Sequence, residues 1–108
     1  MILTTTGRAT GRRLRTPLWY VREGDTIYCV SGWGSSSDWL KNLLAHPEAV
    51  VQIGRRRWET RAATQGTPEI GDLLLKFQRK YGRRTVKLFY HLDRLVPVGF
   101  QLSTPDRR

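Results

Sequence analysis

Apolar and polar residues alternate along several short segments of the chain, and this spacing predicts strands. The clearest case is 57–63, where Trp58, Thr60 and Ala62 would share one face and charged residues the other. Shorter runs predict further strands at 2–6, 13–22, 26–31, 48–53 and 95–102. Pro17 cannot donate to a ladder, so it indicates a bulge or an unpaired edge. Large apolar groups nevertheless lie on both faces after Pro17, so we expect 13–22 to be a central strand.

Two segments have helical spacing instead. Serines at 35–37 followed by Asp38 predict a helix start, and the sequence His46-Pro47 ends that helix. Thr67-Pro68-Glu69 predicts a second helix, which continues to Gly82. Its polar side carries Lys76, Arg79 and Lys80, and exposure to solvent would be enough to explain that basic face. Residues 84–92 fit either a helical turn or an extended segment.

This order of elements predicts a mainly β fold of the α+β class. We expect a six-stranded antiparallel barrel whose open edge is covered by two or three short helices. At 108 residues, the chain is expected to form one domain, 1–108. Barrels of this kind often pair as dimers.

The connection between the first two strands is strongly basic. Gly7 and Gly11 bracket a tight turn, and four arginines stand within eight residues: Arg8, Arg12, Arg13 and Arg15. Guanidinium groups bind phosphate or carboxylate through paired hydrogen bonds, so this turn is a candidate anion site. A solvated basic hairpin is the alternative.

A second polar loop follows the strand at 26–31. Ser31, Gly32, Trp33 and the serines after them end a strand and open a helix. Free backbone N–H groups gather at such a helix start, so an anion or a polar ring could bind there.

The amino-acid composition limits the kinds of binding partner and site that the protein can have. Lys and Arg number 19 against 9 Asp and Glu, a net charge of +10, which favours a polyanionic partner: nucleic acid, an anionic membrane or a multiply charged ligand. Cys29 is the only cysteine, which excludes an internal disulfide, and the two histidines lack metal-ligand spacing. No signal peptide or membrane-spanning run occurs, so we expect a cytoplasmic protein without a metal.

Motifs of self-contained catalysis are missing from the sequence. It has no nucleophile elbow, no zinc-binding helix motif, no Walker loop and no dinucleotide fingerprint. If the protein is an enzyme, a bound cofactor supplies the reactivity and the chain supplies orientation.

Several segments together resemble the deazaflavin-dependent nitroreductase family. The opening Thr4-Thr5-Thr6-Gly7-Arg8-Ala9-Thr10-Gly11 and the later run Thr16-Pro17-Leu18-Trp19-Tyr20-Val21-Arg22-Glu23-Gly24-Asp25 are similar to its first motifs. The helix Trp39-Leu40-Lys41-Asn42-Leu43-Leu44-Ala45-His46-Pro47-Glu48 resembles another. The resemblance covers nearly the whole chain.

That resemblance implies a split β-barrel, commonly dimeric, that binds coenzyme F-420, a deazaflavin with a phosphate and a polyglutamate tail. Its reduced form would pass a hydride to a quinone, enone or nitro compound. The implied cofactor-binding residues are Thr6, Gly7, Arg8, Thr10, Gly11, Arg12, Arg15, Thr16, Pro17, Ser31, Gly32, Trp33 and Trp39. Of these, Gly7, Arg8, Thr10, Gly11 and Arg12 would hold the phosphate and tail, and Ser31, Gly32 and Trp33 would lie along the ring. Trp19, with Tyr81 or Tyr90, would line the acceptor pocket.

The chain departs from the family pattern at three positions. Leu14 replaces a usual arginine, Leu40 replaces a usual aromatic residue, and Trp33 stands where a small residue is usual. Related barrels bind flavin mononucleotide (FMN), haem or a tetrapyrrole, so FMN is the alternative cofactor.

Two other functions compete with an oxidoreductase. A basic nucleic-acid-binding module would need exposed aromatic residues, whereas Trp39, Trp58 and Phe77 fall on faces predicted to be buried. A non-catalytic carrier on the same barrel stays open, as does peripheral contact with a membrane.

Overall fold

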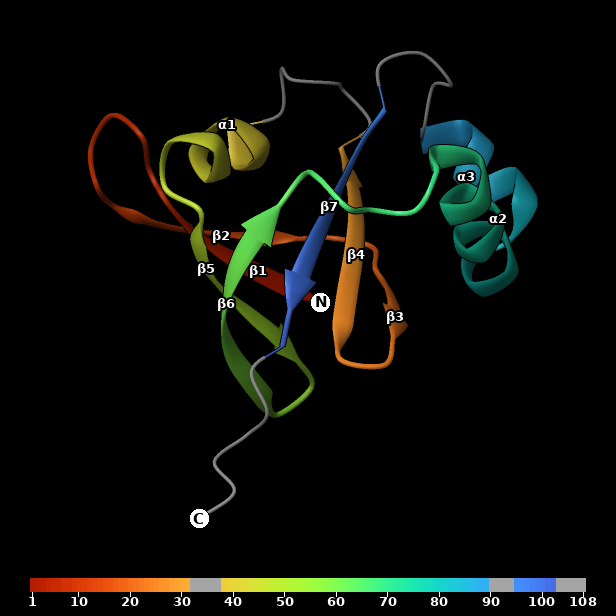
Figure 1. Ribbon diagram of the computed structural model, residues 1–108, viewed down its shortest axis with the longest axis horizontal. Helices are drawn as coiled ribbons and strands as arrows, with labels where there is room; N and C mark the ends of the chain where they lie inside the picture. Colours follow the sequence, from red (N-terminus) through yellow and green to blue (C-terminus); the bar gives the residue numbers. More distant parts are fainter. Residues whose placement is uncertain (32–37, 90–94, 103–108) are drawn as a thin grey trace.

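The computed structural model describes residues 1–31, 38–89 and 95–102, which form seven strands and three helices (Figure 1). The strands are β1 Ile2–Thr6, β2 Arg13–Pro17, β3 Val21–Glu23, β4 Thr26–Ser31, β5 Glu48–Ile53, β6 Arg56–Ala63 and β7 Val96–Gln101. The helices are α1 Asp38–Ala45, α2 Ile70–Tyr81 and α3 Arg83–Phe89. The mainly β, barrel-like α+β class predicted from sequence is therefore confirmed.

All seven strands belong to one curved antiparallel sheet in the order β2-β1-β5-β6-β7-β4-β3. The β1–β2 and β5–β6 hairpins lie toward one end of the sheet, and the β3–β4 hairpin lies at the other. Helix α1 lies on the β1–β2 side, whereas α2 and α3 lie together beyond β3 and β4 (Figure 1). No helix in the described part of the chain is long and apolar enough to cross a bilayer.

The prediction of one central strand over 13–22 was wrong, because this segment forms two strands at opposite ends of the sheet. β2 pairs only with β1 and is largely exposed, whereas β3 pairs with β4. Pro17 ends β2, and the next N–H, that of Leu18, donates to the Met1 carbonyl at 2.9 Å. The residues Leu18–Tyr20 then carry the chain across to β3, which accounts for a seventh strand.

The apolar residues separate into two buried clusters. The first fills the concave side of the sheet beneath α1 and includes Leu3, Ile27, Val51, Val98 and Phe100, all fully buried. The second lies between α2, α3 and the strands β3 and β4, and it is built around Leu73 and Phe77. Each helix group thus has its own core.

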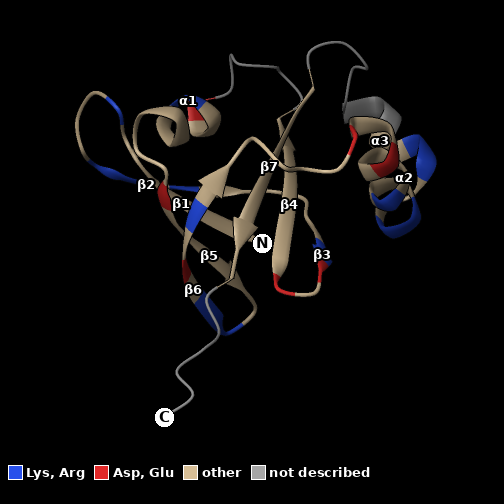
Figure 2. Ribbon diagram, in the orientation of Figure 1, with Lys and Arg blue, Asp and Glu red and all other residues tan. Residues whose placement is uncertain are grey.

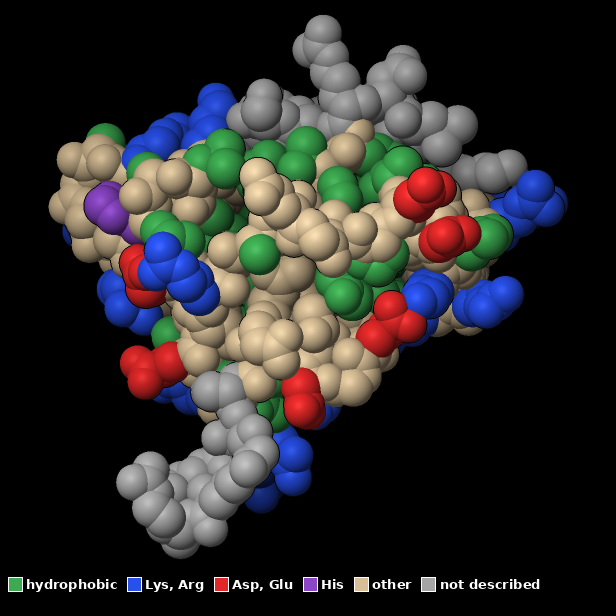
Figure 3. Space-filling model, viewed as in Figure 1, with side chains coloured by type: hydrophobic (Ala, Val, Ile, Leu, Met, Phe, Trp, Pro, Cys, Tyr) green, Lys and Arg blue, Asp and Glu red, His purple; other side chains and the backbone are tan. Residues whose placement is uncertain are grey.

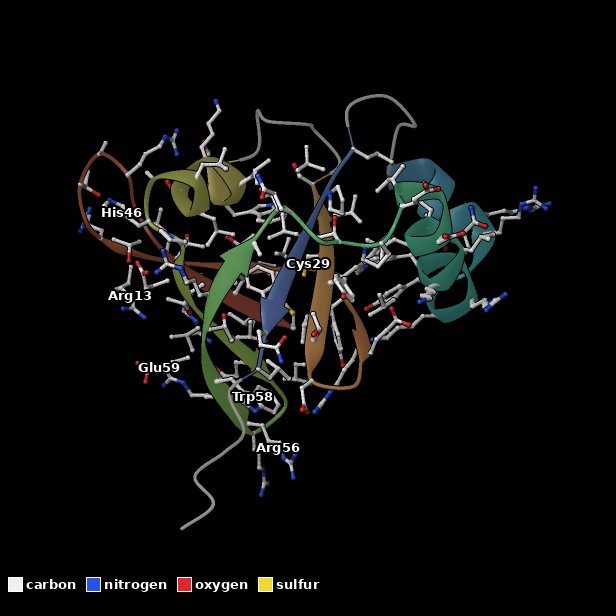
Figure 4. The ribbon with its side chains drawn as sticks, viewed as in Figure 1. Arg13, Cys29, His46, Arg56, Trp58 and Glu59 are labelled. Carbon is white, nitrogen blue, oxygen red and sulfur yellow. The ribbon has the colours of Figure 1, made fainter. Side chains whose placement is uncertain are left out.

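Strand β6 follows its predicted alternation. Trp58 and Thr60 are buried, whereas Arg57, Glu59 and Arg61 are exposed. Figure 4 shows Trp58 against the sheet interior and Arg56 and Glu59 turned outward. The burial predicted for Trp39, Trp58 and Phe77 is also confirmed, which removes these rings as base-stacking platforms.

The helix boundaries differ from expectation at one point. Helix α2 begins at Ile70, after Glu69, and no side chain caps it. The predicted start at Thr67-Pro68 was therefore wrong by a few residues, since residues 64–69 after β6 form bends and irregular backbone. Gly82 ends the helix with φ +93°, and its N–H donates to the Gln78 carbonyl at 2.9 Å. The ambiguous segment is helical from Arg83 to Phe89.

We predict that Phe77→Ala destabilises the protein by about 3–5 kcal/mol, because it empties the centre of the second cluster. The free energy of unfolding would be measured by urea denaturation followed by circular dichroism. Leu75→Ala is the matched control on the same helix, since Leu75 is 52% exposed. Equal losses in the two variants would contradict the second core.

Candidate functional site

The basic turn between β1 and β2 is a closed loop of backbone hydrogen bonds. The Gly7 N–H donates to the Arg12 carbonyl at 2.7 Å, and the Gly11 N–H donates to the Gly7 carbonyl at 2.9 Å. Gly11 adopts φ +73°, which favours glycine. A Cβ on Gly7 would lie 3.0 Å from Thr10 Oγ1 and 3.3 Å from the Arg12 carbonyl. The predicted tight turn is therefore present. A side chain would be sterically unfavourable at Gly7 and at Gly11.

Arg8 does not extend freely into solvent, because it is held against α1. Its backbone N–H and its Nη1 both donate to Asn42 Oδ1, at 3.2 and 2.8 Å. Its Nη2 lies 3.3 Å from Asp38 Oδ1 in a partly exposed ion pair. An exposed pair of this kind contributes at most about 1 kcal/mol. Arg8 therefore fixes the turn to the helix, and a bound anion would share it with Asp38.

Asn42 is the residue at this site that sequence reasoning missed. It is buried on α1, and its Nδ2 donates to Thr5 Oγ1 of β1 at 3.4 Å. Asn42 thus connects β1, α1 and the basic turn. Its only sequence signal was an amide within the apolar face of a helix, and that signal could not identify its partners.

The other predicted anion-binding residues are spread along β2. Thr6 pairs with Arg13 beside the turn, whereas Pro17 pairs with Ile2 at the far end. Pro17 lies four positions along β2 from Arg13, a distance of about 13 Å. Arg12 and Arg15 are exposed and have no ion-pair partner in the described part of the chain. The structure therefore gathers Gly7 to Arg12 with Thr6, and it leaves Thr16 and Pro17 away from the turn.

Positive charge marks the turn, β2, the tip of the β5–β6 hairpin and α2 (Figure 2). Leu14, where the resemblance leads us to expect an arginine, pairs with Thr5 and is 45% exposed. Arg13 and Arg15, its neighbours on β2, alternate with it along the strand. The turn therefore keeps its basic character without an arginine at position 14.

The predicted ring-binding residues fall into two groups. Ser31 is buried at the end of β4, where it pairs with Val96, and Trp39 lies on the buried side of α1 in the first core cluster. Gly32 and Trp33 lie outside the described residues. The contact predicted between Ser31, Gly32, Trp33 and a ring stays a prediction.

Two of the predicted acceptor-pocket residues meet. The Trp19 and Tyr81 rings stack with centroids 4.9 Å apart at 15°, and Phe77 backs Tyr81 at 6.0 Å. The Tyr81 hydroxyl accepts from the Tyr20 N–H and donates to the Tyr20 carbonyl, both at 3.1 Å. The Tyr81 ring therefore stacks on Trp19, while its hydroxyl holds the backbone of the chain crossing, the segment Leu18–Tyr20 between β2 and β3. Tyr90 lies outside the described residues.

Within the described residues, the side chains offer no catalytic set of their own. No group of three His, Cys, Asp or Glu could hold a metal there. Burial raises the pKa of the Cys29 thiol well above its ordinary value, against smaller opposing effects of the N-terminus and Lys80. Figure 4 places Cys29 inside the barrel, so it is not an accessible nucleophile. The described side chains are therefore suited to binding and orienting a ligand.

Comparison with known proteins agrees with this architecture. A solved F420-H2 dependent reductase superposes with a TM-score of 0.69 at 25% identity, covering 93% of this chain and 90% of that one. The haem storage protein HutZ of Vibrio cholerae superposes with a TM-score of 0.69 at 11% identity, covering 96% and 81%, and shows the fold alone. A third structure, described as a domain-swapped dimer, matches with a TM-score of 0.69 at 25% identity, covering 93% and 77%.

Sequence comparison gives the family. An F420H(2)-dependent quinone reductase of Mycobacterium tuberculosis is 34% identical over 61 residues, which are 54% of this chain and 41% of that protein. The match thus spans about two fifths of that curated relative. The fold and the site define a split β-barrel of the flavin-reductase type. Within this class, the chain belongs to the F420H(2)-dependent quinone reductase family, whose model matches residues 1–98.

We predict that Asn42→Ala destabilises the protein by about 1–3 kcal/mol, because the Thr5 hydroxyl and Arg8 lose their shared partner. Leu44→Ala on the same helix is the control, since Leu44 is 61% exposed. Both free energies of unfolding would be measured by urea denaturation. A loss for Asn42→Ala no larger than the control's would contradict the bridging role.

Proposed function

We propose that residues 1–108 form one cofactor-binding domain of a deazaflavin-dependent oxidoreductase. In this proposal the domain binds reduced coenzyme F-420 and directs its hydride to a small organic acceptor, of which a quinone is the best supported. The family match over residues 1–98 carries the proposal, because it includes the basic turn, the chain crossing and helix α2.

The basic turn fits the anionic part of such a cofactor. Gly7 and Gly11 bring backbone close to the ligand without side chains, and Thr10 adds a hydroxyl. Arg12 and Arg15 are exposed and free of ion pairs in the described part of the chain. Guanidinium groups in this state can pair with phosphate or carboxylate oxygens.

The stacked pair Trp19 and Tyr81 is the proposed wall of the acceptor pocket. Two adjacent aromatic rings present an apolar surface on which a planar acceptor can lie. The cofactor, when bound, supplies the hydride. The chain's part is to orient the acceptor and to exclude water, since no described side chain forms a nucleophile with its base.

The first prediction of this proposal concerns cofactor binding. Purified protein should bind coenzyme F-420 saturably, as followed by fluorescence, and Arg12→Ala should weaken binding by about 1.5–3 kcal/mol. Arg55→Ala removes the same charge from an exposed position in the β5–β6 hairpin and should leave affinity almost unchanged.

FMN titrated in parallel distinguishes the alternative cofactor. A preference for FMN would keep the barrel and overturn the assigned chemistry. Once binding is established, loss of reduced-cofactor absorbance on adding a quinone separates an oxidoreductase from a carrier, which would bind without turnover.

We also propose that two copies of the chain associate. The support is the relative described as a domain-swapped dimer, together with the exposed edge strand β2. Light scattering at micromolar concentration should give twice the 12.5 kDa of one chain. A monomer mass across the concentration range would refute association.

A further inference from the structure

A second basic region lies on the other side of the molecule, between strand β3 and helix α2. It borders an open surface pocket of about 500 Å³. The pocket is separate from the basic turn, which lies between β1 and β2 at the opposite end of the sheet order. Its lining comprises Tyr20, Val21, Arg22, Glu23, Ile53, Lys76, Arg79 and Lys80.

The lining contains four basic side chains and one carboxylate. Glu23 pairs with Lys76, which leaves the charges of Arg22, Arg79 and Lys80 without a counter-ion in the described part of the chain. Figure 3 shows basic and acidic side chains close together at the edge of the molecule where Figure 1 labels β3 and α2. The residual charge of this pocket is therefore strongly positive.

Two of these cations are fixed in place. Lys80 Nζ donates to the Tyr20 carbonyl at 2.9 Å and lies 3.3 Å from the centroid of the Tyr20 ring. Arg22 Nε donates to the Gly24 carbonyl at 2.9 Å, and its guanidinium lies 5.6 Å from the Trp58 ring. These contacts fix Lys80 against Tyr20 and Arg22 against Trp58, and both residues line the pocket.

Each fixed cation also retains donors for a ligand. An ammonium group has three N–H donors and Lys80 uses one of them on Tyr20, while a guanidinium has five. Arg79 is exposed at the same pocket and makes no ion pair with any described residue. An oxyanion in the pocket could accept charge-assisted hydrogen bonds from the donors that these side chains leave unused.

We propose that this pocket binds a small ligand with at least two anionic oxygens, either a phosphate or a polycarboxylate. The proposal does not depend on the cofactor assignment, since it uses none of the residues of the basic turn. Tyr20 and Lys80 line the pocket and also contact Tyr81, so its occupancy is coupled to the Trp19–Tyr81 pair. Ligand binding should therefore change tryptophan fluorescence.

The test uses inorganic pyrophosphate and citrate as probes, titrated separately into the whole chain at low ionic strength by calorimetry. We expect saturable binding of at least one probe, and about five-fold or greater weakening by Arg79→Gln. Arg84→Gln is the matched control, because it removes the same charge from an exposed position on the adjacent helix α3. The probe that binds more tightly identifies the phosphate or the carboxylate class.

Three outcomes would overturn the proposal. The first is no binding of either probe. The second is equal weakening by Arg79→Gln and Arg84→Gln, which would mean a diffuse effect of net charge. The third is binding that is lost in Arg12→Gln but kept in Arg79→Gln, which would place the probe at the basic turn. None of these outcomes contradicts the cofactor proposal, which the separate F-420 titration tests.

Discussion

The short crossing from β2 to β3 is the constraint on which the rest of the structure depends. Within Leu18–Tyr20, the chain passes from one edge strand of the sheet to the other. Pro17 releases it from β2, and the Tyr81 hydroxyl takes up both backbone groups of Tyr20. Because these groups would otherwise need water, the crossing fixes α2 against the sheet. The crossing thereby places the Trp19 ring in a stacked contact with Tyr81.

The basic turn obeys a second, local constraint. Four arginines close in sequence suggest a site completed by an anion, but the structure neutralises one of them internally. Asn42 and Asp38 hold Arg8, so its main contribution is to give the turn a single orientation on α1. The capacity for an external anion then rests on Arg12 and Arg15. In the proposed function, neighbouring arginines therefore have different roles: Arg8 orients the turn, whereas Arg12 and Arg15 bind the anion.

Local patterns predicted most of the fold because they depend on neighbours in sequence. The alternation in β6 and the glycine turn followed from such patterns, and the breaking effect of Pro17 was recognised. The edge position of β2 was missed, since apolar side chains after Pro17 belong to the crossing and not to a covered strand. Asn42 contacts Arg8, 34 positions away, and Tyr81 contacts Tyr20, 61 positions away. A repeating pattern within one segment cannot predict contacts over such separations.

The division of the interior into two clusters has a consequence for how such a domain can diverge. Residues that orient the basic turn belong to α1 and the barrel interior, whereas Trp19, Phe77 and Tyr81 belong with the α2–α3 cluster. We expect substitutions deep in one cluster to leave the packing deep in the other largely intact, since distant sites act nearly additively. In the proposed function, evolution could therefore change the acceptor pocket while the cofactor-binding turn is inherited unchanged, and a protein engineer could randomise α2 alone.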